Sequence, residues 1–99
     1  MLRYKISERA ERDMQSVRHW YDQIGRTLGD RVIDAVYDVI RLARERPTSF
    51  PEISEGTRVA RCRRFPYRVY FVVTDDLVNV LAVYHTAREP ERWDDPDRD

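Results

Sequence analysis

Apolar and polar residues alternate along the N-terminal half with two different periods, and each change of period marks a new predicted element. Residues 2–6 alternate between apolar and charged side chains, which is typical of a strand with one buried face. Residues 7–25 and 27–46 each repeat their apolar positions every three or four residues, which predicts two amphipathic helices. A short connection makes these helices an antiparallel hairpin.

The first helix is predicted to begin after Ser7, whose hydroxyl can accept a hydrogen bond from the first turn, and to end at Gly25. Glu8 and Glu11 lie in the first turn, where the helix dipole favours acids. The predicted apolar stripe consists of Ala10, Met14, Val17, Tyr21 and Ile24.

The second helix is predicted to open with Thr27 and Asp30, which resemble a capping box, and Pro47 prevents it from continuing past Arg46. Its predicted stripe consists of Leu28, Val32, Val36, Val39 and Ala43, widened by Ile33 and Ile40. Neither stripe can be buried by one helix alone, so both helices are expected to pack on a sheet.

The C-terminal half predicts that sheet. Residues 47–57 contain two prolines and a glycine and are predicted to form a loop, with Phe50 and Ile53 holding it to the core. The predicted strands that follow are Val59–Phe65, Arg68–Thr74 and Val78–His85, with turns at Pro66-Tyr67 and Asp75-Asp76. The order β-α-α-β-β-β predicts an α+β domain with a helical hairpin on one face of a small, mainly antiparallel sheet.

Strand alternation predicts which side chains face the helices. That face is expected to hold Val69, Phe71, Val73, Leu81 and Val83, and the other face Arg68, Tyr70, Val72, Val80, Ala82 and Tyr84. Arg61 and Arg63 share their parity with Val59 and Phe65, which predicts a bulge or an edge position nearby.

Length and composition indicate one small domain at residues 1–93 with an acidic, frayed tail at 94–99. Cys62 is the only cysteine, which predicts a buried apolar role, no disulfide and no metal site. No apolar run is long enough for a signal peptide or a membrane span, so the chain is expected to be cytoplasmic and to need no cofactor.

Charge is unevenly distributed in a chain whose formal net charge is zero. Residues 1–57 are neutral, residues 58–93 carry seven arginines against four acids, and residues 94–99 carry four aspartates against one arginine. Residues 58–71, RVARCRRFPYRVYF, hold five arginines and no acid. This stretch is predicted to attract phosphates or an acidic protein, because screening limits each field to about 10 Å. A solvated strand face paired with helix acids is the alternative.

Between Tyr4 and Trp93 the chain resembles the RelE/ParE superfamily of bacterial toxins. The resemblance rests on the element order, on the YRVYFV strand entered through Tyr67-Arg68, and on the H-x-x-R-x-P pattern of His85, Arg88 and Pro90. It implies a plasmid or chromosomal toxin-antitoxin module. ParE-like members inhibit DNA gyrase, whereas RelE-like members cleave mRNA on the ribosome.

The residues favour a ParE-like inhibitor over a ribosome-dependent ribonuclease. By resemblance, the ribonuclease residues would be Arg61, Arg68 and Arg88, with His85 or Tyr84 as acid or base. Val59, however, lies where a lysine is expected, and Asp94 lies near the expected distal tyrosine. His85 is equally compatible with a half-buried structural role. A non-toxic member that only binds its partner is the third interpretation.

The resemblance also implies a cognate antitoxin, which binds DNA itself and covers the toxin with an amphipathic C-terminal segment. The residues predicted to bind the antitoxin or the target are Arg58, Arg61, Arg63, Arg64, Arg68, Tyr70, Tyr84 and Arg88.

Overall fold

A computed structural model of the protein describes residues 1–88; the predicted tail at 94–99, Pro90 and Trp93 lie outside these residues. The elements are β1 (Arg3–Ile6), α1 (Glu8–Ile24), α2 (Leu28–Glu45), the 3-10 turn η1 (Pro47–Ser49), β2 (Glu52–Ser54), β3 (Thr57–Arg61), β4 (Tyr67–Thr74), β5 (Leu77–His85) and the 3-10 turn η2 (Thr86–Arg88). The two predicted helices and three of the four predicted strands begin and end within a few residues of these bounds.

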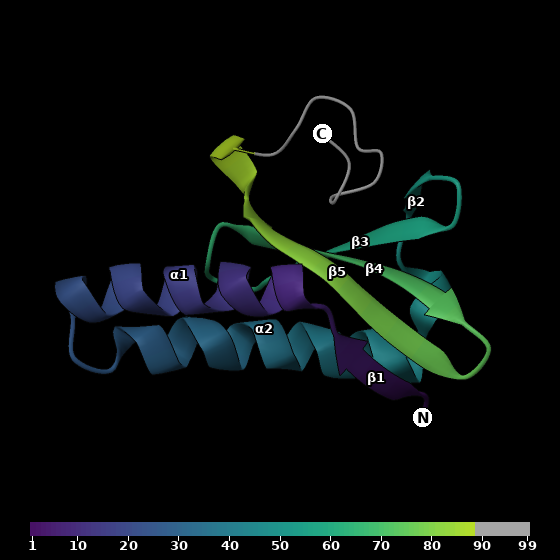
Figure 1. The fold of residues 1–99 in the computed structure, drawn as a ribbon, viewed down its shortest axis with the longest axis horizontal. Helices are drawn as coiled ribbons and strands as arrows, with labels where there is room; N and C mark the ends of the chain where they lie inside the picture. The colour runs from purple at the N-terminus through teal and green to yellow at the C-terminus, as the bar shows by residue number, and fades with distance from the viewer. Residues whose placement is uncertain (89–99) are drawn as a thin grey trace.

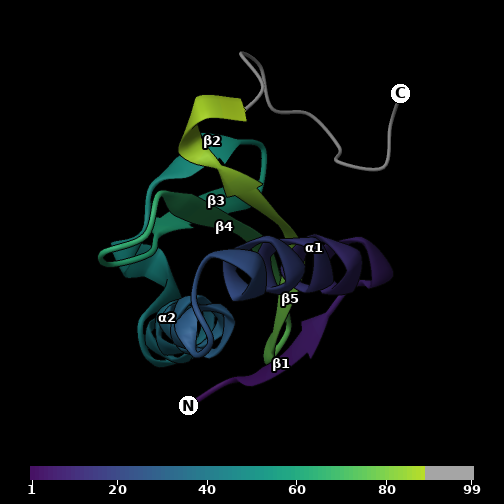
Figure 2. The same ribbon diagram turned by 90° about the vertical axis from the view of Figure 1, so that its left-hand side faces the viewer.

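The sheet has the strand order β1-β5-β4-β3-β2, in which β1 runs parallel to β5 and all other pairs are antiparallel. Both helices lie on the same side of the strands (Figures 1 and 2), which confirms the predicted α+β class. The α1–α2 turn projects beyond the sheet, at the end of the molecule away from the β4–β5 turn (Figure 1). No helix among residues 1–88 has the length and apolar character needed to cross a membrane.

The helix α1 starts as predicted. Ser7 Oγ accepts a hydrogen bond from the Ala10 backbone N–H at 3.0 Å and donates one to the Leu81 carbonyl at 3.0 Å. Ser7 therefore caps the helix and joins it to β5 through one hydroxyl group. Gly25 ends the helix and donates its N–H to the Tyr21 carbonyl.

Replacing Ser7 with alanine is expected to lower the free energy of unfolding by about 1 to 2 kcal/mol, because one hydroxyl serves both a helix cap and a strand carbonyl. Thr27→Ala is the matched control, since Thr27 precedes α2 but makes no side-chain cap. Urea unfolding of both variants measures the difference. Equal losses would contradict the assigned role of Ser7.

The capping box predicted for α2 is wrong. Thr27 makes no side-chain cap, and Asp30 instead accepts a hydrogen bond from Arg18 of α1. The Asp22 carboxylate of α1 lies against Gly29, where a Cβ atom would overlap it and would lie 2.9 Å from the Arg18 carbonyl oxygen. The two helices therefore approach closely at their connected ends, and α1 supplies the polar groups around the start of α2.

A bulge at Leu81 changes the predicted facing of β5. Tyr70 pairs with Ala82 and Phe71 pairs with Val80, so Leu81 is an extra residue without a partner in β4. Val80 consequently lies in the main core between sheet and helices, which corrects its predicted place on the opposite face, and Leu81 is not part of that core. Beyond the bulge, the side chains of β5 alternate between the two faces in the predicted way, so Val83 faces the helices as predicted.

The remaining corrections concern the loop and the ends of elements. Residues 47–57 contain η1 and β2, so the sheet has a fifth strand that the sequence did not predict. Phe50 packs on the core and lies 5.9 Å from the Phe71 ring, as predicted. Ile24, Ile53 and Val73 were predicted to be buried but are 58%, 40% and 37% exposed.

The strand predicted at Val59–Phe65 is shorter than expected. β3 ends at Arg61, and residues 62–66 form the β3–β4 turn. The bulge or edge position predicted near Arg61 and Arg63 therefore corresponds to the end of a strand and not to a bulge. Arg64 has φ 72, in the left-handed region that non-glycine residues rarely adopt. The turn therefore exposes both Arg63 and Arg64, whereas in a continuous strand their side chains would point to opposite faces. The predicted turn at Asp75-Asp76 is confirmed, with Asp75 at φ 57.

Candidate functional site

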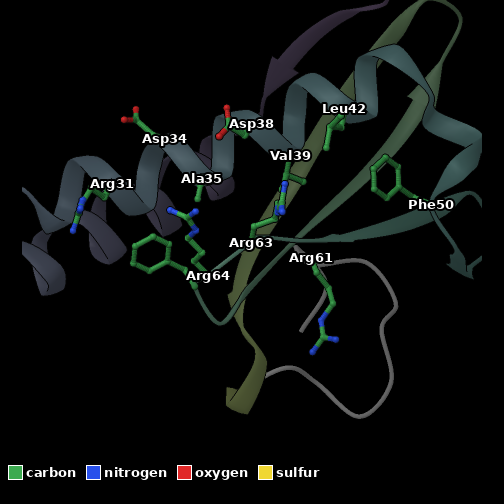
Figure 3. Close-up of a pocket in the computed structure, with 11 residues that line it drawn as sticks. Arg31, Asp34, Ala35, Asp38, Val39, Leu42, Phe50, Arg61, Arg63 and Arg64 are labelled. Atoms are coloured by element: carbon green, nitrogen blue, oxygen red, sulfur yellow. The ribbon is translucent and has the colours of Figure 1, made fainter.

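A basic surface lies where β3 ends and the β3–β4 turn begins. Arg61, Arg63 and Arg64 are all exposed, and none of them forms an ion pair within residues 1–88. Figure 3 shows Arg63 and Arg64 extending toward α2, whereas Arg61 points away from that helix. The arginines therefore serve two different surfaces.

Arg63 and Arg64 border a groove of about 500 Å³ between α2 and the β3–β4 turn, which we name the α2 groove. It is lined by Arg31, Asp34, Ala35, Asp38, Val39, Leu42, Phe50, Arg61, Arg63, Arg64 and Phe65. Ala35, Val39 and Leu42 recur every three or four residues, which gives the groove an apolar base of the kind that accepts an amphipathic segment. Its charged residues on α2 are Arg31, Asp34 and Asp38, whereas β3 and the β3–β4 turn contribute only arginines.

Arg61 belongs to a row of polar side chains that crosses the face of the sheet opposite the helices. Arg61 pairs with Arg68 on β4, and Arg68 pairs with Tyr84 on β5, so the three side chains share that face. Arg9 of α1 completes the row: its guanidinium lies 5.1 Å from the centre of the Tyr84 ring and donates to the Tyr84 hydroxyl.

Sequence reasoning missed Arg9, because its contact with Tyr84 joins residues 75 positions apart. No local pattern near Arg9 indicates this contact. Guanidinium groups are suited to binding anions, and the row carries those of Arg9, Arg61 and Arg68.

Other predicted binding residues have different surroundings. Arg58 donates to the Phe50 carbonyl at 2.6 Å and lies 3.6 Å from Glu52, so it holds the loop against β3. Tyr70 is fully buried beside Ala82 and underlies the row without being exposed. Arg88 is the last residue of η2.

The residues predicted for a ribonuclease do not all meet on one face: Arg61, Arg68 and Tyr84 share one face, and His85 lies on the other. His85 pairs with Tyr67, its ring lies 5.2 Å from the Tyr67 ring, and Tyr67 belongs to the core on the helix side of the sheet. Arg61 and Arg68 lie on the opposite side. His85 Nδ1 also accepts a hydrogen bond from the Ala87 backbone N–H at 3.0 Å, so this ring nitrogen is used at the point where β5 ends.

Neither a thiolate nor a metal centre arises from the described groups. Burial raises the pKa of the Cys62 thiol to about 12, which keeps it neutral. Residues 1–88 contain no group of three or more His, Cys, Asp or Glu side chains that could hold a metal ion. The chemistry of the exposed site is therefore that of guanidinium groups beside apolar and aromatic surface, which is suited to binding.

Comparisons with known proteins agree with the fold. A family model described as the ParE toxin of the type II toxin-antitoxin system, parDE, matches residues 4–90. A solved chain from the chromosomal ParDE TA system of P. aeruginosa aligns with a TM-score of 0.75 at 17% identity, over 86% of this chain and 96% of that chain. At this identity the structural likeness supports the fold alone. No curated protein gives a significant match.

Proposed function

Because the chain belongs to the family of ParE toxins of type II toxin-antitoxin systems, we propose that it inhibits DNA gyrase and is neutralised by a cognate antitoxin. Family membership makes the protein the toxin component of a type II toxin-antitoxin module. The identity of the target and the mode of neutralisation are the proposed parts. Both processes would take place in the cytoplasm, where gyrase and its DNA are found.

The single observation that carries a binding function over RNA cleavage is the separation of His85 from the arginine row. Cleavage by the RNA's own 2′-hydroxyl requires a base for that hydroxyl and an acid for the leaving oxygen, close to cations on the phosphate. His85 is the only histidine near the end of β5, and it lies on the helix side of the sheet. Arg61 and Arg68 can hold a phosphate but have no imidazole beside them, and the hydroxyl of Tyr84, the other predicted acid or base, accepts a hydrogen bond from Arg9.

The α2 groove supports neutralisation by an antitoxin segment. Its apolar base can take side chains spaced three or four residues apart, and Arg63 and Arg64 can bind acids on the same segment. Ordering a disordered segment costs free energy, and this cost is offset by burying apolar surface together with charge pairs. In this proposal DNA is contacted only through the antitoxin.

The target is tested with the purified toxin and with expression in the absence of antitoxin. Expression without antitoxin is expected to arrest growth with DNA-damage signalling. The purified toxin is expected to abolish DNA supercoiling by gyrase at toxin concentrations near those of the enzyme, and added antitoxin is expected to restore it. Ribosome-bound mRNA is expected to remain intact.

Two outcomes would contradict this function. Cleavage of ribosome-bound mRNA with normal supercoiling would select the ribonuclease activity. Normal growth and normal supercoiling would select a protein that only binds its antitoxin.

A further inference from the structure

The arginine row has an apolar row beside it on the same face of the sheet. Two residues further into each strand, Val59 pairs with Tyr70 and Tyr70 pairs with Ala82, so the three side chains share that face. Tyr70 and Ala82 are fully buried, although both helices lie on the other side of the strands (Figure 2). The Tyr70 ring lies 5.5 Å from the Tyr84 ring, so the two rows are in contact. This face therefore combines cations with apolar side chains that are buried like a core.

The strands give this face a positive charge that they do not balance. The strands of residues 1–88 contain one acid, Glu52 of β2, which lies 3.6 Å from Arg58. Arg61 is exposed and belongs to no ion pair within the same residues. An acidic segment would therefore be attracted to the row.

The acids at the start of α1 do not cancel this charge. The Asp13 carboxylate accepts the Val83 backbone N–H at 3.0 Å, at the edge of β5. Glu11 lines a groove between the two helices, on the other side of the molecule from the row. Glu8 has Arg12 four positions later on the same helix surface, so their charges offset each other. An excess of positive charge remains at the row.

The segment that follows the described residues has the complementary chemistry. Residues 89–95, EPERWDD, which we name the C-terminal segment, contain four acids and one arginine and so sum to −3. Their one large apolar side chain is Trp93. Carboxylates form strong hydrogen bonds with guanidinium groups, and an indole gains from contact with other aromatic rings. The segment therefore offers one partner for each of the two rows.

The chain leaves the sheet beside the arginine row. β5 ends at His85, one residue after Tyr84, and η2 follows directly. The Thr86 backbone N–H donates to the Pro66 carbonyl of the β3–β4 turn at 2.9 Å, which holds this exit at the end of the sheet. Two strand spacings separate β5 from β3, or about 10 Å. About three extended residues span that distance, so the C-terminal segment is long enough to cross the face.

We propose that the C-terminal segment of this chain occupies the face of the sheet opposite the helices, with Trp93 on the apolar row and its acids beside the arginine row. A segment tethered so closely acts at an effective concentration of about millimolar. It therefore covers Arg61 until a partner with a larger acidic and apolar surface displaces it. The inference does not depend on which target the toxin inhibits.

Trp93 reports on this contact when it is the only tryptophan. Trp20→Phe provides that background, because the chain has two tryptophans and Trp20 is 57% exposed. The Trp93 indole is expected to be protected from acrylamide quenching in the native protein and accessible in urea. Glu91→Gln with Asp95→Asn should lower the ratio of docked to undocked segment by about fivefold, the effect of losing two exposed charge pairs. Arg61→Glu should lower it in the same direction.

Two control variants keep the same charge changes away from the contact. Asp97→Asn with Asp99→Asn removes two negative charges beyond the C-terminal segment. Arg26→Glu reverses an exposed arginine in the α1–α2 turn. Both controls should leave the quenching of Trp93 unchanged, and all variants should keep the melting temperature of the Trp20→Phe protein within a few degrees.

A hexaglutamate peptide measures the consequence for binding. Trp93→Ala is expected to bind this peptide at least about fivefold more tightly than the wild type, because a larger fraction of the protein has an uncovered row. Trp20→Ala should bind it as the wild type does. An equal affinity of the Trp93→Ala variant and the wild type would overturn the inference.

Three outcomes of the quenching measurement would also overturn it. Equal access of acrylamide to Trp93 in the native protein and in urea would leave the face to a separate partner. Protection that increases with protein concentration would assign the contact to the segment of a second copy. Protection that persists in both the Arg61→Glu and the Glu91→Gln/Asp95→Asn variants would place the segment on another surface.

Discussion

Reversing Arg61 and Arg64 to glutamate together is expected to weaken antitoxin binding by about a hundredfold at low salt, or roughly 3 kcal/mol. Both side chains are exposed and have no ion pair within residues 1–88, so their charge is available to an acidic segment. Each substitution replaces an attraction with a repulsion. Because salt screens these interactions, the wild-type affinity should fall steeply as salt is added and the variant affinity should fall less.

The control for this pair changes the same net charge elsewhere. Lys5→Glu with Arg12→Glu alters two exposed cations that do not line the α2 groove. Titration calorimetry at two salt concentrations should show a near-normal affinity for the control. An unchanged affinity of the Arg61→Glu/Arg64→Glu variant at both salt concentrations would exclude both the α2 groove beside Arg64 and the opposite face at Arg61 as binding sites for an acidic antitoxin segment.

Replacing Gly29 with leucine is expected to lower the free energy of unfolding by about 2 kcal/mol, the balance between overpacking and a gain in helix propensity of about 1 kcal/mol. The reason is the close contact of the two helices. Any side chain at Gly29 displaces the Asp22 carboxylate and presses on the Arg18 carbonyl, which belongs to the α1 backbone and cannot rotate away. For a domain of this size, the melting temperature should fall by about 8 to 16 °C.

Two further variants separate the causes of this loss. Asp34→Leu places the same side chain at an exposed position of α2 and should leave the melting temperature nearly unchanged. Asp22→Ala combined with Gly29→Leu should recover only part of the stability, because the contact with the Arg18 carbonyl remains. If Gly29→Leu had the same melting temperature as the wild type, the two helices could move apart without loss of stability, which would contradict this prediction.

The two helix starts show what a local pattern can predict. Ser7 caps α1 because its hydroxyl needs only the Ala10 N–H, a group three residues away. Thr27 and Asp30 have the same kind of spacing, yet Asp30 binds Arg18 of the neighbouring helix. The partner of Asp30 therefore comes from another helix, and the sequence around Thr27 does not indicate it.

The sheet shows the same limit for strands. Alternation correctly predicted that Val69, Phe71 and Val83 face the helices. It could not predict the position of Val80, because the bulge at Leu81 is defined by pairing with β4 and by the contacts that Ser7 makes with this part of β5. β2 was missed for a related reason: its three residues form a strand only because β3 lies beside them.

By itself, the sequence determined the helices, the order of the elements, the main core and the concentration of arginine at residues 58–71, since each depends on residues close together in the chain. Only the tertiary structure decided how those arginines divide. Arg58 holds a loop, Arg63 and Arg64 border the α2 groove, and Arg61 joins Arg68, Tyr84 and Arg9 on the opposite face. The direction of each side chain depends on where β3 ends and on which strand or helix lies beside it. Those are long-range contacts, and no local spacing of residues encodes them.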